Sequence, residues 1–218
     1  MIRIAPSLLS ADFANLDREV KAITAAGADF LHLDVMDGSF VPNITFGAPI
    51  IKAIRPSSDI VFDVHLMIDE PIRYLDDFIK AGADFISFHA EATDKIRETL
   101  TYIKAHGVKA ALAIKPHTDP RILDDYIDLL DMILIMTVEP GFGGQSLIPE
   151  ALDNARYAKT LIDRSGREIL LEADGGIKAS NAHLLSEAGV EVLVAGSAVF
   201  CANDYRKAIE DIRNSALS

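Results

Sequence analysis

Short runs of apolar, often β-branched residues alternate along the chain with longer amphipathic segments, and the alternation repeats eight times. The apolar runs predict strands at 2–7, 30–36, 60–67, 85–89, 109–114, 132–136, 168–173 and 190–195. The amphipathic segments predict helices between them, for instance at 15–26, 71–81, 94–106, 151–164 and 180–188. A glycine closes three helices just before a strand, as a helix C-cap does, in A-G-A-D-F at 26–30 and 81–85 and in A-G-V-E-V at 188–192.

Strands that alternate with helices are typical of parallel βαβ units. Eight such units in 218 residues, without a linker or a shift in composition, predict one domain over residues 1–218. The predicted fold class is α/β, a closed (β/α)8 barrel of the TIM-barrel type near the small end of its size range. A doubly wound open sheet is the alternative. That fold usually has fewer strands and carries G-x-G-x-x-G after the first one, which this chain lacks.

The chain is acidic, which narrows the classes of partner. It has 21 Lys and Arg against 33 Asp and Glu, a formal net charge of −12. This charge disfavours nucleic acid and anionic membranes, because both are polyanions. The single cysteine, Cys201, excludes an internal disulfide. The N-terminus lacks the pattern of a signal peptide, and no apolar run approaches about 18 residues, so we expect a cytoplasmic protein.

Polar residues occupy the C-terminal ends of three predicted strands, where a (β/α)8 barrel carries its chemistry. Side chains along a strand alternate between its two faces, so every second residue shares a face. The residues that share the barrel-facing side are His32, Asp34 and Met36 on the second strand, Asp63, His65 and Met67 on the third, and Glu172 and Asp174 on the seventh.

Taken singly, each of these residues is typical of a hydrogen-bonded core position. Gathered in one cavity, two imidazoles and two carboxylates are costly to desolvate unless they bind something. We therefore predict a site for one divalent metal ion, zinc, manganese, iron(II) or cobalt, with the ligands His32, Asp34, His65 and Asp174. Asp63 and Glu172 lie one layer deeper and are expected to orient the ligands, whereas His89 is expected to be a structural residue at the end of the fourth strand.

Glycine-rich segments follow the last three strands and predict a phosphate site. Loops after the seventh and eighth strands are the usual phosphate position in these barrels, and glycine lets backbone N–H groups approach the ligand. The residues concerned are Gly141, Phe142, Gly143 and Gly144 after the sixth strand, Gly175 and Gly176 after the seventh, and Gly196 and Ser197 after the eighth. A small phosphorylated molecule that spans the metal ligands and this cradle is the predicted substrate.

The chain resembles the ribulose-phosphate 3-epimerase family nearly from end to end. The matching segments are A-P-S-L-L-S-A-D-F at 5–13, H-L-D-V-M-D-G at 32–38, F-V-P-N-I-T-F-G at 40–47, D-V-H-L-M at 63–67, M-T-V-E-P-G-F-G-G-Q at 136–145, D-G-G-I at 174–177 and V-A-G-S-A-V-F at 194–200. One departure is Ala173, where the family pattern has valine, and it affects only packing. The resemblance implies a metal-dependent interconversion of D-ribulose 5-phosphate and D-xylulose 5-phosphate by inversion at carbon 3.

The resemblance also implies roles for individual residues and an assembly state. Asp34 and Asp174 are implied as the acid–base pair, and both with His32 and His65 as metal ligands. Ser7 and His65 are implied to contact the sugar, and the glycine-rich positions named above, with Ser197, to hold the phosphate. The methionines Met36, Met67 and Met136 are implied to cover the reacting carbon, although as core filler they have a simpler explanation. The family further implies a homo-oligomer, a dimer or a hexamer.

Three other functions remain open. A 3-epimerase of a six-carbon ketose phosphate such as D-allulose 6-phosphate needs the same chemistry in a longer site. A metal-independent phosphoribosyl isomerase or decarboxylase has a similar barrel, but the D-x-K-x-x-D arrangement typical of the decarboxylases is missing. A non-catalytic phosphate- or metal-binding barrel is the alternative outside the enzymes. The sequence leaves open the metal, the oligomeric state and the direction in which each aspartate acts.

Overall fold

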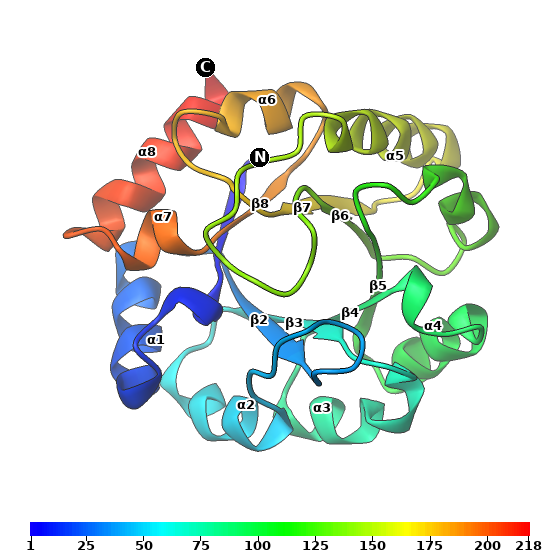
Figure 1. Ribbon diagram of the computed structural model, residues 1–218, viewed down its shortest axis with the longest axis horizontal. Helices are drawn as coiled ribbons and strands as arrows, with labels where there is room; N and C mark the ends of the chain where they lie inside the picture. The colour runs from blue at the N-terminus through cyan, green and yellow to red at the C-terminus, as the bar shows by residue number, and fades with distance from the viewer.

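Eight parallel strands form a ring at the centre of the molecule, and helices surround it (Figure 1). The computed structural model describes all residues from Met1 to Ser218. The strands are β1 (Arg3–Pro6), β2 (Phe30–Met36), β3 (Val61–Met67), β4 (Phe85–His89), β5 (Lys109–Ile114), β6 (Met132–Met136), β7 (Leu170–Asp174) and β8 (Val192–Ala195). They pair in the order β1-β8-β7-β6-β5-β4-β3-β2, and a parallel bridge between Ser7 and His32 joins the ends of this order. The predicted (β/α)8 barrel is confirmed.

α-Helices cover the outside of the ring after every strand except β5. They are α1 (Leu16–Ala26), α2 (Ala48–Ile54), α3 (Leu75–Ala81), α4 (Ile96–Ala105), α5 (Ala151–Ser165), α6 (Ala182–Glu187), α7 (Ser197–Phe200) and α8 (Tyr205–Leu217). Between β5 and β6 the connection is a 3₁₀ helix, Pro120–Asp125, instead of an α-helix. The helix predicted at 71–81 is wrong in its first part. Pro71–Arg73 forms a separate 3₁₀ turn, and Tyr74, with φ −120° and ψ −1°, breaks the α-helical path before α3.

The apolar core has two parts, one outside the ring of strands and one inside it. Fifty-three buried residues form the main core between the strands and the helices. A second cluster fills the interior of the ring and contains Ala5, Phe30, Phe85, Ala111, Met132, Val192 and Val194; Phe30, Phe85 and Met132 are the first residues of β2, β4 and β6 and so lie at the N-terminal end of the barrel. Above this apolar floor the interior turns polar, because Ser7, His32 and Asp63 are buried there. The floor seals one end of the barrel, so the polar groups open only toward the C-terminal ends of the strands.

The repeated A-G-A-D-F segment has a structural role at the opposite, N-terminal end of the barrel. Gly27 and Gly82 cap α1 and α3 with φ of 92° and 96°, a region that glycine enters without steric strain. Asp29 and Asp84, two residues after these glycines, each accept a hydrogen bond from a backbone N–H of the preceding strand in the chain. Asp131, just before β6, accepts the same kind of hydrogen bond from β5. The pairs are Asp29 with Ile4, Asp84 with Phe62, and Asp131 with Ala110. Each aspartate also pairs with a basic side chain and so ties adjacent strands together.

Replacement of Asp84 by alanine tests this tie. The Asp84 carboxylate accepts from the Phe62 N–H at 2.8 Å and from Arg55 at 2.9 Å, so Asp84→Ala leaves both donors without this acceptor. We expect the free energy of unfolding to fall by about 1–2 kcal/mol, measured by urea denaturation. The control is Asp59→Ala, at an exposed nearby position, for which we expect a change within about 0.5 kcal/mol. Equal midpoints for the two variants would contradict this role for Asp84.

Candidate active site

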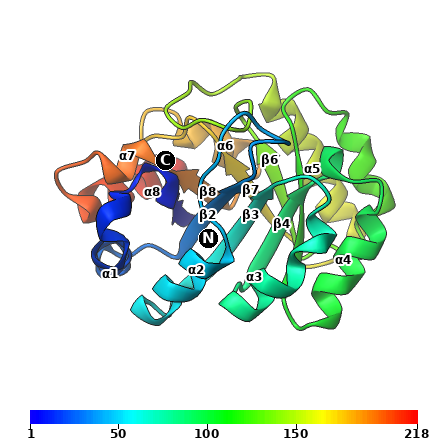
Figure 2. The same cartoon turned by 60° about the horizontal axis from the view of Figure 1, so that its bottom comes forward.

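A cavity of about 860 Å³ opens at the C-terminal ends of the strands. Figure 2 shows that the segments after β2 and after β6 lie at this same end of the barrel. The predicted site residues that line the cavity are Ser7, Asp34, Met36, Met67, Met136, Gly141, Phe142, Gly143, Gly144, Asp174, Gly175, Gly176, Gly196 and Ser197. His32 and His65 are fully buried and absent from the cavity lining. The structure therefore brings all of the predicted residues to one end of one barrel.

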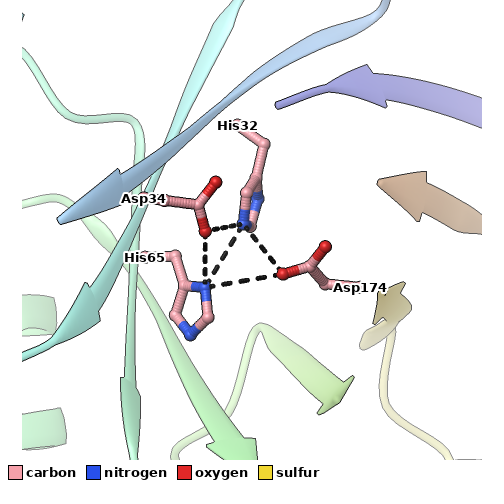
Figure 3. Close-up of side chains that lie close together, drawn as sticks. All are labelled: His32, Asp34, His65 and Asp174. Carbon is pink, nitrogen blue, oxygen red and sulfur yellow. Dashed lines mark hydrogen bonds and ion pairs between the residues drawn. The ribbon is translucent and has the colours of Figure 1, made fainter. Parts of the chain in front are cut away.

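Two histidines and two aspartates converge beside this cavity (Figure 3). Strand register explains part of the arrangement, because Asp34 on β2 lies opposite His65 on β3. Asp174 reaches the same point from β7, across the barrel. The Nε2 atom of His32 lies 3.3 Å from Nδ1 of His65, and each of these nitrogens lies 3.4 Å from Oδ1 of Asp34. Oδ2 of Asp174 is 3.8 Å from the His32 nitrogen and 3.9 Å from the His65 nitrogen.

These four atoms fit a bound divalent cation. Metal–ligand bonds of about 2.0–2.1 Å in a tetrahedron place the ligand atoms about 3.3–3.4 Å apart, close to the separations just given. Charge also agrees. Asp34, Asp63, Glu172 and Asp174 crowd four carboxyl groups around two imidazoles, and a divalent cation offsets this excess of acidic groups. The cluster could therefore hold one metal ion; imidazole and carboxylate donors suit several divalent ions and do not select one.

Neighbouring groups hold the ligands in position. Nδ1 of His32 lies 2.5 Å from Oδ2 of Asp63; a neutral His32 that donates its proton to this carboxylate would direct the Nε2 lone pair at the cluster. Ser7 donates its hydroxyl to Oδ2 of Asp34 at 2.5 Å, so Oδ1 of Asp34 faces the two histidines. Asp63 therefore lies where the sequence predicted an orienting residue. Glu172 lies 3.8 Å from His32 Nδ1, and both of its carboxyl oxygens are buried without a hydrogen-bond partner.

Burial and neighbouring charges shift the pKa values of these carboxyl groups in different directions. Burial and the nearby Asp34 carboxylate raise the pKa of Asp174 to about 6. Burial and the neighbouring Asp63 raise the pKa of Glu172 well above its ordinary value, which favours a neutral Glu172. Burial opposes ionisation of Asp34 too, but His32 and His65 outweigh it and hold the pKa of Asp34 well below its usual range. The two aspartates thus differ in basicity before any ligand binds.

Three methionines are among the apolar side chains that line the cavity. Met36 and Met67 pack with Val41, and Met136 packs with Val138 in a separate group. These methionines are nearly buried and line the cavity as well, so core filling and covering a ligand are compatible for them. The segment after β6 crosses over the mouth of the barrel in Figure 1. Asn43 of the segment after β2 donates its side-chain amide to the carbonyl oxygen of Gly141 at 2.8 Å and joins the two segments.

The glycine-rich segments present free backbone donors to the cavity. The N–H groups of Gly143, Gly144, Gly176 and Gly196 donate to no protein acceptor. A Cβ at Gly196 would lie 2.6 Å from Oγ of Ser10, and one at Gly176 would lie 2.4 Å from the backbone nitrogen of Leu147. Close approach of backbone atoms therefore requires glycine at Gly176, whereas a Cβ at Gly196 would displace the side chain of Ser10. Such an array of unpaired N–H groups suits an anion and needs no basic side chain.

Sequence reasoning missed several residues of the site. Ser10 lines the cavity beside Gly196, and its signal was its place in the A-P-S-L-L-S segment. Asn43 carries the link to Gly141, and nothing in the sequence pattern points to that contact. The cavity also continues past the glycines to Lys178 and Lys207. His89 was predicted to be structural at the strand end. The structure buries it completely and places its Nε2 atom 3.0 Å from Nε2 of His65.

The chain is similar to known proteins over nearly its whole length. The model of the "Ribulose-phosphate 3 epimerase family" matches residues 3–200. The chain is 50% identical over 216 residues to the ribulose-phosphate 3-epimerase of Bacillus subtilis, covering 99% of this chain and 100% of the relative. It is 47% identical over 212 residues to that of Escherichia coli, covering 97% and 94%.

Solved structures with lower identity share the fold. 3-Hexulose-6-phosphate synthase has a TM-score of 0.71 at 20% identity, covering 98% of both chains. The 3-keto-L-gulonate-6-phosphate decarboxylase from Vibrio cholerae has a TM-score of 0.74 at 16% identity, covering 99% of this chain and 96% of that one. At these identities the likeness concerns the barrel alone. No helix of the structure has the length and apolar character needed to cross a membrane.

Metal titration tests the cluster directly. After removal of metal with a chelator, we expect the protein to bind one zinc ion per chain and to unfold at a higher temperature with zinc than without it. His65→Ala should weaken zinc binding by more than about 100-fold, because it removes a ligand rather than a neighbour of a ligand. The matched control is His183→Ala on α6, which should bind zinc as the parent does. Unchanged zinc affinity in His65→Ala would contradict the cluster as a metal site.

Proposed function

The chain belongs to the ribulose-phosphate 3-epimerase family and is an epimerase, and we propose that it interconverts D-ribulose 5-phosphate and D-xylulose 5-phosphate by inversion at carbon 3. The observation that carries the proposal is the placement of two carboxylates, Asp34 from β2 and Asp174 from β7, on opposite sides of the histidine pair (Figure 3). Both line the same cavity.

Inversion at carbon 3 needs acid–base groups on both faces of the reacting carbon. The proton at carbon 3 is acidic because the ketone at carbon 2 is adjacent, and its removal gives a planar enediolate. One carboxylate takes the proton from one face, and the other returns a proton to the opposite face. Because the reaction runs in both directions, Asp34 and Asp174 exchange these roles.

A divalent ion at His32, Asp34, His65 and Asp174 (zinc, iron(II), manganese or cobalt) supplies, when bound, Lewis-acid stabilisation of the negative charge that develops on the substrate. The chain itself holds the ligand atoms in place. Ser7 fixes Asp34 through a hydrogen bond of 2.5 Å, and Asp63 fixes His32 in the same way. Such preorganised polar groups need no rearrangement as charge develops.

The rest of the cavity binds and protects the substrate. The free N–H groups of Gly143, Gly144, Gly176 and Gly196 hold the phosphate, which anchors the sugar at the far end from carbon 3. Met36, Met67 and Met136 cover the reacting carbon with side chains that carry no exchangeable proton and exclude water. A cytoplasmic location and a homo-oligomer, a dimer or a hexamer, stay predictions.

A second candidate substrate is D-allulose 6-phosphate. The cavity has a volume of about 860 Å³, and its lining also includes Lys178 and Lys207, beyond the residues assigned to the pentose phosphate. The ratio of kcat/KM for the two ketose phosphates discriminates between them, since the chemistry at carbon 3 is the same. A higher kcat/KM for the six-carbon substrate would replace the pentose phosphate in the proposal and leave the acid–base pair intact.

Asparagine at either aspartate tests the acid–base pair. We expect Asp34→Asn and Asp174→Asn each to lower kcat by about 10²–10⁴-fold, in an assay that couples D-xylulose 5-phosphate formation to a second enzyme. Asp59→Asn is the control and should retain full activity, because Asp59 is exposed and lies before β3, away from the cavity.

Proton exchange in D₂O separates the two roles further. Each variant keeps one carboxylate, so it should exchange the carbon-3 proton of only one of the two epimers, followed by NMR. Exchange of both epimers by either variant, or kcat within tenfold of the parent, would overturn the assignment.

Gly196→Ala tests the phosphate cradle. The new Cβ meets Ser10 and intrudes where Gly196 now offers a free N–H, so we expect KM to rise by about tenfold or more. Inhibition by inorganic phosphate should weaken in parallel. Gly107→Ala is the control. The φ of Gly107 is 78°, which is strained for alanine, but this residue follows α4 and lies outside the cavity. That variant should lose stability and keep its KM. A Gly196→Ala protein with parental KM and phosphate inhibition would refute the cradle.

A further inference from the structure

A chain of three side chains leads from the metal cluster to the protein surface. Figure 3 shows that one ring nitrogen of His65 faces the cluster and the other points away from it. The second nitrogen, Nε2, lies 3.0 Å from Nε2 of His89. Nδ1 of His89 lies 3.2 Å from Oε2 of Glu91, just beyond the end of β4. Both histidines are fully buried, and the Glu91 side chain is 24% exposed.

Hydrogen-bond polarity along this chain has only one arrangement that leaves the cluster able to bind metal. A metal at Nδ1 of His65 needs the lone pair there, so the proton of the neutral ring sits on Nε2. That N–H donates to Nε2 of His89, which must therefore be an acceptor. A neutral His89 then carries its proton on Nδ1 and donates it to the Glu91 carboxylate. Every contact from Glu91 to His65 is satisfied in this state.

Glu91 is itself held in place by other donors. Its Oε1 atom accepts from the backbone N–H of Lys115 at 2.9 Å and from the hydroxyl of Thr118. Its Oε2 atom is thereby left for His89. Burial raises the pKa of Glu91, but the hydrogen bonds from His89, Lys115 and Thr118 outweigh burial and bring this pKa to about 2. Glu91 therefore presents an ionised carboxylate, which accepts hydrogen bonds and cannot donate one.

The ring of His89 is also fixed from its other side. Phe40, in the segment after β2, packs against it with ring centroids 4.9 Å apart. Nζ of Lys115 lies 4.3 Å from the centroid of the Phe40 ring. His89 is thus packed between Phe40 and His65, whose ring centroid is 5.1 Å from that of His89. Side chains enclosed in this way have little freedom to turn, so the chain of hydrogen bonds keeps its geometry.

We infer that Glu91 is a positioning residue for the metal site: acting through His89, it holds His65 in the tautomer whose Nδ1 lone pair faces the cluster. This inference rests on the metal site of the proposed function and not on its substrate. The tautomer of His32 is set by a direct hydrogen bond to Asp63. The tautomer of His65 is set indirectly, because His89 lies between it and Glu91. The orientation of each histidine of the cluster is thus set by a different carboxylate.

Glu91→Gln reverses the polarity of the chain and is the sharpest test. Lys115 and Thr118 both donate, so they retain the oxygen of the new amide and turn its NH₂ toward His89. His89 then accepts at Nδ1 and donates from Nε2, and the proton of His65 is displaced to Nδ1, where it competes with the metal. We expect the dissociation constant for zinc to rise by about 10–100-fold, measured by competition with a chelating dye. Glu98→Gln, exposed on α4, is the control and should bind zinc as the parent does.

Ring ¹⁵N NMR of the zinc-loaded parent protein provides a second measurement, which needs no substitution and so does not depend on whether a variant folds. We expect His89 to carry its proton on Nδ1, with Nε2 unprotonated, and His65 to carry its proton on Nε2. A proton on Nε2 of His89 would overturn the inference, as would parental zinc affinity in a folded Glu91→Gln protein. Neither readout involves substrate. A protein that shows both expected results but does not epimerise contradicts the proposed function and leaves this inference standing.

Discussion

Burial of ionisable groups inside the barrel is the constraint on which the rest of this structure depends. Asp63, Glu172, His32 and His65 are fully buried, Asp34 is buried at the edge of the cavity, and Asp174 is largely buried beside them. Charges removed from water are costly unless each finds a partner. The structure meets this cost with short hydrogen bonds, such as those of Asp63 and Ser7, and with a cluster that matches a divalent cation, while burial raises the pKa of Glu172 and so favours its uncharged form.

The barrel makes such burial possible because its two ends differ. At the N-terminal end Phe30, Phe85 and Met132 fill the interior and keep water from reaching the cluster from below. Aspartates and their basic partners brace this same end from outside, for example Asp84 with Arg55. At the C-terminal end the strands can carry polar residues, since those residues face a cavity instead of a packed core. Stability and chemistry are thus separated along one axis of the fold.

Residues outside the cavity lining also contact the cluster. His89 and Glu91 belong to the β4 end of the barrel, yet they contact His65 through its outer nitrogen. Phe40 closes over His89 from the segment after β2, which reaches the segment after β6 through Asn43. Side-chain contacts therefore join the histidine and aspartate cluster to the segment after β2 and, through Asn43, to the glycine-rich segment after β6.

The sequence by itself determined the fold and the composition of the site. Eight alternations of apolar runs and amphipathic segments allow only a few architectures, and alternation along β2 and β3 already places His32, Asp34 and His65 on one face. Tertiary structure decided what depends on distance across the ring. Asp174 comes within 4 Å of His32 only because β7 lies across a closed barrel from β2. Contacts such as Asn43 with Gly141, or His65 with His89 and Glu91, join residues whose sequence spacing carries no periodic signal, because loop paths and side-chain rotamers are set by packing rather than by local pattern.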